Sequence, residues 1–346
     1  MSTEALGVGA FSQRVSPRTR SRLHRQLAFI VMLVLLFATT WSLFSTIRYA
    51  QTRRALPQIL PGASFIAQGM PPRYAGSIFD VNGPNAVAVS PDGERIYVTE
   101  GDGERVTKAF DISGRLLGTL VPPNTTRAIR KPFYVAVGDD ERVYVSDRMR
   151  PGVLMYDRNG AFLGVYQPEE AEGGWVPLGI QAQRNGLLAV TDIRSNAHRV
   201  LVFASNEEVQ QRLLAGPANS RLDFPTAAVR DDSGRTYVSD SNNARIVIYD
   251  AGGTAIGELP AADPRGGVAL PRGMGIDDLG RLYAVDAASH DVKVFQTGDQ
   301  LQFLFSFGIG GVDDGQFRYP NGITVDRRGR VWVADWGNNR VQMWHY

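Results

Sequence analysis

Acidic residues recur at the end of a strand-like run, and in several places an arginine follows five residues later. The pairs at this spacing are Glu100 with Arg105, Asp240 with Arg245, and Asp335 with Arg340. A functional interpretation makes these acids a ring of cation ligands. We favour a structural interpretation, in which each acid accepts loop N–H groups and the arginine fixes the loop, because such capping needs no metal.

Two of the repeated acids have no arginine at the matching position. Gly152 stands there after Asp147, and Asp291 stands there after Asp286. The pattern therefore predicts that Asp147 and Asp286 lack this partner and are freer to serve a ligand.

Two histidines occupy matching loop positions, each just before a strand-like run. His198 and His290 would both face a common centre and, with an acid, would form a zinc site. A third histidine at a matching position is absent, and catalytic zinc normally takes three protein ligands. We therefore predict no cofactor, with zinc or calcium as the alternative.

Other catalytic signatures are missing from the sequence. The chain has no cysteine and no GxSxG, HExxH or Walker-type phosphate loop. Nucleophilic and nucleotide chemistry therefore have no support, and a binding role is favoured over an enzymatic one.

The elements that must position these residues repeat six times along the chain. The leading prolines of the six copies are Pro84, Pro132, Pro177, Pro225, Pro271 and Pro320, separated by 48, 45, 48, 46 and 49 residues. Within a copy, short runs rich in Val, Ile, Tyr and Trp alternate with period two and are separated by Gly-containing hairpins, which predicts strands. Four antiparallel strands per copy make one blade of a propeller, so the fold class is an all-β, six-bladed β-propeller.

The sixth copy ends after its third strand, at Tyr346. The run YAGSIF, from Tyr74 to Phe79, precedes the first copy and is expected to complete the sixth blade as its outer strand. This closure would leave no unpaired sheet edge at the seam.

These residues resemble a known repeat family. The succession PNGI, D, GRVWVAD and NNRV in the sixth copy, and DSNNARIVIYD from Asp240 to Asp250, are similar to the NHL repeat. The resemblance extends over about Tyr74 to Tyr346 and implies a six-bladed NHL propeller. A second resemblance, to the six-bladed peptidyl amidoglycolate lyase with its His-rich zinc site, implies the enzymatic alternative: a metal-dependent extracytoplasmic lyase or hydrolase.

An uncharged apolar run precedes the propeller. Residues 27–44 read LAFIVMLVLLFATTWSLF, eighteen residues that as a helix span about 27 Å. We predict a single-pass transmembrane helix over residues 27–49, rather than a cleaved signal peptide. Arginines are more numerous before this run than after it, which favours a cytoplasmic segment 1–26, a Pro-containing linker 50–73 and an extracytoplasmic propeller 74–346 at the cell membrane.

Charge is divided unevenly along the chain. Residues 1–55 hold eight arginines and one glutamate, a formal charge of +7, so the remaining residues carry −5 of the total of +2. A mildly acidic ring is a poor partner for a polyanion. Nucleic-acid binding is therefore not expected.

The loops that enter each first strand and those between second and third strands share one face of a propeller, which we call the loop face. Aromatic, arginine, amide and histidine side chains there are typical of interaction surfaces. The candidate binding residues are Tyr134, Arg148, Trp175, Arg194, Asn242, Arg272, His290, Arg318, Trp336 and Asn338. The preferred hypothesis is a membrane-anchored scaffold that binds a protein partner on this face, as an accessory subunit of a larger membrane complex.

Overall fold

The computed structural model describes most of the chain from residue 70 onward. The described residues are 29, 31–34, 36–37, 39–40, 70–167, 174–183, 186–195, 197–204, 208–261, 263–264 and 266–346. The chain divides into two compact units, Met1–Leu56 and Pro57–Tyr346.

In the first unit, the described residues between 29 and 40 are helical and exposed. The Thr40 hydroxyl donates to the Leu36 carbonyl at 2.9 Å, so this polar side chain bonds to its own helix. Within the residues that the structure describes, no helix has the length and apolar character needed to cross a membrane. Segment 1–26, most of 27–49 and residues 50–69 of the linker lie outside the described residues.

The second unit contains six four-stranded antiparallel sheets, which we number as blades in chain order. Blade 1 consists of β2 (Pro84–Val89), β3 (Arg95–Glu100), β4 (Thr107–Asp111) and β5 (Leu116–Leu120). Blade 2 consists of β6 (Pro132–Val137), β7 (Val143–Asp147), β8 (Val153–Tyr156) and β9 (Phe162–Tyr166). Blade 3 consists of β10 (Pro177–Ala182), β11 (Leu188–Asp192), β12 (Arg199–Phe203) and β13 (Val209–Leu213).

The remaining blades repeat this order. Blade 4 consists of β14 (Pro225–Arg230), β15 (Thr236–Asp240), β16 (Arg245–Tyr249) and β17 (Ala255–Pro260). Blade 5 consists of β18 (Pro271–Ile276), β19 (Arg281–Asp286), β20 (Asp291–Gln296) and β21 (Gln302–Phe307). Blade 6 consists of β24 (Pro320–Val325), β25 (Val331–Asp335), β26 (Arg340–His345) and β1 (Arg73–Ile78).

Short elements occur in the connections between strands. They are the 3-10 turns η1 (Arg127–Ile129), η4 (Pro217–Asn219), η5 (Ser241–Asn243) and η6 (Trp336–Asn338), and the two-residue parallel pair β22 (Ile309–Gly310) and β23 (Gln316–Phe317).

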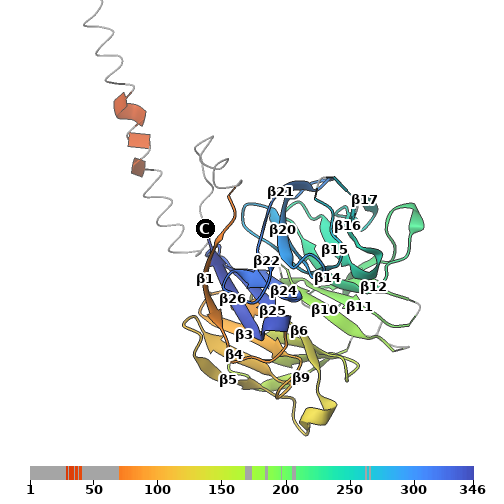
Figure 1. Ribbon diagram of the computed structural model, residues 1–346. Helices are drawn as coiled ribbons and strands as arrows, with labels where there is room; N and C mark the ends of the chain where they lie inside the picture. The colour runs from red at the N-terminus through yellow and green to blue at the C-terminus, as the bar shows by residue number, and fades with distance from the viewer. Residues whose placement is uncertain are drawn as a thin grey trace, which may run out of the picture. The chain divides into compact units, whose positions relative to one another are not determined.

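The prediction of a six-bladed propeller closed by the N-terminal strand is confirmed. Strand β1 pairs antiparallel with β26, and Tyr74 lies opposite Trp344, so the sixth blade joins segments from the two ends of the propeller (Figure 1). Outer strands such as β5, β9 and β17 lie at the periphery, and first strands such as β24, β6 and β14 lie toward the centre (Figure 1).

Each first strand begins at the proline that led the sequence repeat, and each second strand ends at the acid. Proline is tolerated at the first residue of a strand because it has no N–H to contribute to the ladder. In all six blades the proline lies directly opposite the acid, as with Pro320 and Asp335. The repeat thus places six carboxylates at equivalent points on the loop face.

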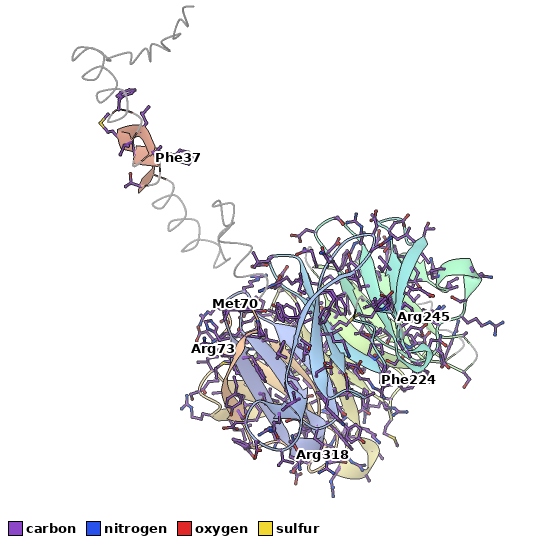
Figure 2. The ribbon with its side chains drawn as sticks, turned by 45° about the horizontal axis from the view of Figure 1, so that its top comes forward. Phe37, Met70, Arg73, Phe224, Arg245 and Arg318 are labelled. Atoms are coloured by element: carbon purple, nitrogen blue, oxygen red, sulfur yellow. The ribbon has the colours of Figure 1, made fainter. Side chains whose placement is uncertain are left out.

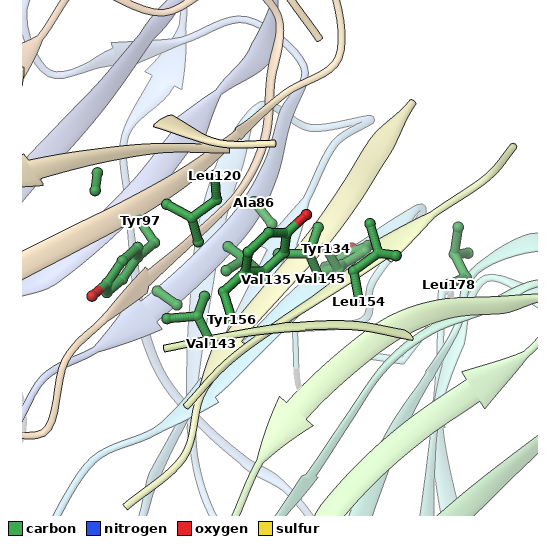
Figure 3. Packing of buried hydrophobic residues seen from close by; sticks show 12 residues of the cluster. Ala86, Tyr97, Leu120, Tyr134, Val135, Val143, Val145, Leu154, Tyr156 and Leu178 are labelled. Carbon is green, nitrogen blue, oxygen red and sulfur yellow. The ribbon is translucent and has the colours of Figure 1, made fainter. Parts of the chain in front are cut away.

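The core lies between adjacent blades rather than at one centre. One cluster joins Tyr97 of blade 1, Val145 and Tyr156 of blade 2, and Leu178 of blade 3 (Figure 3). These side chains are at most 1% exposed, so burial of apolar area between neighbouring sheets is the main stabilising term.

Candidate binding site on the loop face

A cavity of about 360 Å³ opens among the loop-face residues, and we call it the loop-face funnel. Its lining is mainly aromatic, charged or amide in character. The side chains that define it are Phe133, Phe224, Tyr319, Trp336, Lys131, Arg148, Arg272, Asp102, Asn85 and Asn321. The volume falls at the low end of the range for small-ligand pockets.

Two arginines stack on aromatic rings at this funnel. The Arg148 guanidinium lies 5.5 Å from the Phe133 ring centroid, and that of Arg272 lies 5.9 Å from the Phe224 ring centroid. Neither arginine, nor Lys131, forms an ion pair within the described residues. Three cations against the single acid Asp102 give the funnel a positive charge in an otherwise acidic ring.

The two histidines predicted as metal ligands accept hydrogen bonds from the backbone of two aromatic residues that line the funnel. His198 Nδ1 accepts the N–H of Phe224 at 3.0 Å, and His290 Nδ1 accepts the N–H of Tyr319 at 3.0 Å. Phe224 and Tyr319 each precede a leading proline and have positive φ values of 54° and 49°. That conformation is unfavourable for an aromatic residue, so each histidine compensates by fixing the backbone that presents the ring.

In blade 1 the residue that precedes the leading proline is a glycine rather than an aromatic residue. Gly83 precedes Pro84, has a φ of 56°, and donates its N–H to Asn339 Oδ1 at 2.8 Å. Glycine adopts this conformation without a Cβ clash. Blade 1 consequently contributes no aromatic ring at this position.

The repeated acids hold the entering loops in place in blades 4 and 6. Asp240 accepts the Arg245 Nε–H at 2.7 Å, and Asp335 accepts that of Arg340 at 2.9 Å. Asp335 also accepts the N–H of Arg318 at 2.7 Å. These are the contacts expected from the structural interpretation, and both carboxylates are fully buried.

The first copy departs from the predicted pairing. No Glu100–Arg105 contact occurs in the described structure, and Glu100 instead lies 3.2 Å from Lys108 Nζ. Arg105 takes a φ of 54°, which turns the loop at that point, and its Nε has no hydrogen-bond partner among the described residues. The prediction of this pair is therefore wrong.

The acids predicted to be freer behave differently from each other. Asp286 has no arginine at the matching position, but it pairs with Lys293 at 2.6 Å, so the expectation that it is freer to serve a ligand is wrong. Burial acts to raise the Asp286 pKa, but Lys293 and backbone N–H groups outweigh burial and leave the pKa lowered. Asp147 has no ion pair in the described part of the chain and accepts the N–H of Met149 at 2.8 Å. Burial raises its pKa, although backbone N–H groups act against it.

Three of the predicted binding residues line the funnel: Arg148, Arg272 and Trp336. For two other residues the prediction of a binding role on this face is wrong, because their side chains are buried. Trp175 is 1% exposed, and its ring packs in the core against Tyr166 and Phe203. Tyr134 is 5% exposed and lies in the central channel rather than on the rim.

The other predicted binding residues lie outside the funnel lining. Arg318 is exposed at the surface of the ring (Figure 2). Arg194 lies 3.8 Å from Asp192, Asn242 donates to Asp223 at 3.2 Å, and Asn338 donates to the Gly311 carbonyl at 2.9 Å. His290 supports Tyr319 and does not line the cavity.

Sequence analysis missed Asn85, Asp102, Lys131, Phe133, Phe224, Tyr319 and Asn321. All of these except Asp102 are adjacent to a leading proline, which is the signal that would have found them. The face was expected from loop residues as a class, whereas most of the funnel lining flanks the start of the inner strands of blades 1, 2, 4, 5 and 6. Among the described residues, no group of three or more histidine and acidic side chains is arranged to hold a metal ion.

Comparisons with known proteins support the repeat and the fold. The NHL repeat model matches residues 317–344. The human "NHL repeat-containing protein 3" is 32% identical over 74 residues, which is 21% of this chain and 21% of that protein, so the match spans about a fifth of the curated relative.

Two solved structures share the fold. "Streptogramin B lyase" has a TM-score of 0.56 at 15% identity and covers 78% of this chain and 96% of its own. A virginiamycin B lyase from Staphylococcus aureus has a TM-score of 0.54 at 16% identity, covering 79% of this chain and 84% of its own. At these identities the likeness shows the propeller fold alone.

Proposed function

We propose that this protein is a binding scaffold whose loop-face funnel captures a protein partner. The observation that carries the proposal is the combination of unpaired cations with exposed aromatic rings around one open cavity. Trp336 is 42% exposed and Tyr319 is 51% exposed, although large aromatic side chains usually lose most of their area on folding. Aromatic and arginine residues grouped in this way are the usual anchors of protein interfaces.

Photocrosslinking at single positions tests this function. A photoreactive residue replaces Trp336 at the funnel rim or, as a matched control, Leu163 on outer strand β9, which is 52% exposed. We expect a defined protein adduct in native membranes from position 336 and none from position 163. Equal adducts from both positions, or none from 336, would contradict the funnel as the binding face.

We further propose that residues 27–49 anchor the chain in the cell membrane, with residues 1–26 in the cytoplasm and the propeller outside it, as part of a larger membrane complex. The support is the uncharged apolar run and the excess of arginines before it. Alkaline extraction should leave the chain in the membrane pellet, and added protease should reach the propeller in intact cells. Release by alkali, or a protected propeller, would refute this arrangement.

The metal-dependent lyase or hydrolase ranks second. His198 and His290 already use Nδ1 as an acceptor for backbone N–H groups, so only Nε2 of each remains for a metal. Elemental analysis separates the alternatives: zinc or calcium at one ion per chain, lost in the variant His198→Ala with His290→Ala, would reverse the ranking.

A further inference from the structure

The cations of the loop-face funnel lie on opposite walls. Inner strands of consecutive blades contact each other around the closed ring, so blades 2 and 5 face each other across its axis. Lys131 and Arg148 belong to the loops of blade 2, and Arg272 is the second residue of β18 in blade 5. Positive charge therefore spans the mouth of the funnel instead of gathering at one point.

Two of these cations are oriented by aromatic rings. Arg148 stacks on Phe133 and Arg272 stacks on Phe224, and both rings pack against the same hydrophobic cluster. Stacking holds the plane of a guanidinium and leaves the N–H groups at its edge free to donate. Neither guanidinium donates to an acceptor within the described residues. Both are thus positioned donors, and carboxylate oxygens are the acceptors that such donors bind most strongly.

Exposed apolar side chains lie beside the funnel on blade 6. Ile309 and Val312, in the connection from β21 to β24, are 65% and 64% exposed. Exposed apolar residues that gather beside a cavity mark a site of contact with another molecule. We give the name apolar rim to four residues, Ile309, Val312, Tyr319 and Trp336.

Two contacts hold this connection beside the funnel. The Asn338 amide, at the end of η6, donates to the Gly311 carbonyl at 2.9 Å. A Cβ added to Gly310 would lie 3.4 Å from Cδ2 of His290, and the centroid of the His290 ring lies 4.6 Å from that of Tyr319. The apolar rim is therefore packed against the wall of the funnel, next to its cations.

We infer that the funnel binds an acidic segment of a protein partner, with carboxylates of the segment at Arg148 and Arg272 and its apolar or aromatic side chains on the apolar rim. The inference rests on the proposed function and deepens it, because it names the chemistry of the partner.

Charge complementarity favours this occupant. Residues 56–346 carry a formal charge of −5, so an acidic segment is repelled by the ring as a whole and attracted at the funnel, where the cations have no ion-pair partner among the described residues. Because Arg148 and Arg272 lie on opposite walls, two carboxylates of one segment pair with both.

The test is calorimetric titration of the full-length protein with three blocked peptides. The first contains two glutamates and two phenylalanines, the second has glutamine for both glutamates, and the third has alanine for both phenylalanines. We expect the first to bind at least about tenfold more tightly than either of the others. Raising the salt concentration from about 0.05 M to about 0.5 M should weaken only the peptides that carry glutamate.

Single variants locate the two halves of the site. Arg148→Gln and Arg272→Gln should each weaken binding of the first peptide about threefold to tenfold and leave the glutamine peptide unchanged. Arg221→Gln, an exposed loop-face arginine outside the funnel lining, is the matched control and should bind as the parent does. Val312→Ser should weaken the first peptide about threefold and leave the alanine peptide unchanged, whereas Leu163→Ser on β9 should change neither.

Thermal melting checks that each variant is folded. If one arginine variant unfolds, the other decides the result. Equal binding of the glutamate and glutamine peptides, or parent-like binding by the folded arginine variants, would overturn the inference. Benzoate that binds as tightly as the first peptide would also overturn it, in favour of a free acid.

The crosslinking experiment separates this inference from the proposed function. Crosslinks at position 336 without selection for the glutamate peptide would leave the scaffold role standing and refute the acidic partner. Selective binding of the first peptide without crosslinks in native membranes would support the site and contradict the scaffold role.

Discussion

Blades 1 and 6 are neighbours at the seam of the ring, yet their matching acids are held in different ways. Asp335 of blade 6 accepts hydrogen bonds from the Arg318 N–H, the Asn338 amide, the Arg340 guanidinium and the Gln342 amide. Glu100 of blade 1 is equally buried, but its oxygens accept no hydrogen bond within the described residues. The acid at the end of the second strand is therefore held by four hydrogen bonds in blade 6, whereas the matching acid of blade 1 accepts none within the described residues.

The difference follows from the residues around each acid. Arg340, five residues after Asp335, donates a hydrogen bond to its carboxylate. Arg105, five residues after Glu100, has a positive φ and does not contact the Glu100 carboxylate. The longer glutamate side chain meets Lys108 instead. We expect the seam to be stabilised mainly from the blade 6 side.

The largest expected effect is at Asp335. Asp335→Ala leaves the buried Arg340 without its carboxylate and should lower the free energy of unfolding by about 3–5 kcal/mol. Urea unfolding measures it, with Asp335→Asn, which keeps an acceptor oxygen, as the milder companion. A loss as small as that of an exposed ion pair, below about 1 kcal/mol, would break the comparison.

The next effect tests the contact between the two blades directly. Gly322→Ala forces a Cβ to within 2.5 Å of Ala86 Cα, so the inner strands of blades 6 and 1 must separate. We expect destabilisation of about 1–3 kcal/mol, by analogy with overpacked cores. Gly118→Ala on outer strand β5, where nothing lies within 4 Å, is the control and should be nearly neutral in the same melting experiment.

A smaller effect concerns how each blade is entered. His290→Ala removes the acceptor for the Tyr319 N–H and should cost about 1 kcal/mol of unfolding free energy. Adding Tyr319→Gly should recover part of this loss, because glycine adopts the positive φ without strain, as Gly83 does in blade 1. If the second change makes the protein less stable still, strain at Tyr319 is not what His290 offsets.

The smallest effect is expected at Glu100. Glu100→Gln keeps the side-chain volume but removes the ion pair with Lys108 Nζ at 3.2 Å. The Glu100 oxygens accept no hydrogen bond within the described residues, and Lys108 also contacts Asp80, so the free energy of unfolding should change by less than about 1 kcal/mol. Lys108 retains its hydrogen bond to the Asp80 carbonyl at 2.9 Å. A loss comparable to that of Asp335→Ala would remove the distinction between the blades.

Much of the fold was predictable from the residues. All six first strands begin at the predicted prolines, and all six second strands end at the predicted acids. The closing strand Arg73–Ile78 differs by one residue from the predicted Tyr74–Phe79. These features depend on local rules: alternation of apolar residues, turns that need glycine, and the missing N–H of proline.

Less of the candidate site was predictable. Spacing alone suggested that Arg105 pairs with Glu100 and that Asp286 is freer to serve a ligand, and both predictions failed because backbone turns and side-chain reach decide such contacts. Trp175 was predicted to lie on the loop face because it lies in a loop, but its ring packs in the core against the rings of Tyr166 and Phe203.

By itself, the sequence determined the number of blades, their strands and the seam, because hydrophobic periodicity acts within each repeat. Only the tertiary structure decided that residues flanking the leading prolines of different blades meet as one cationic, aromatic funnel. The physical reason is that these residues are far apart along the chain, and only closure of the ring brings their side chains to a common axis.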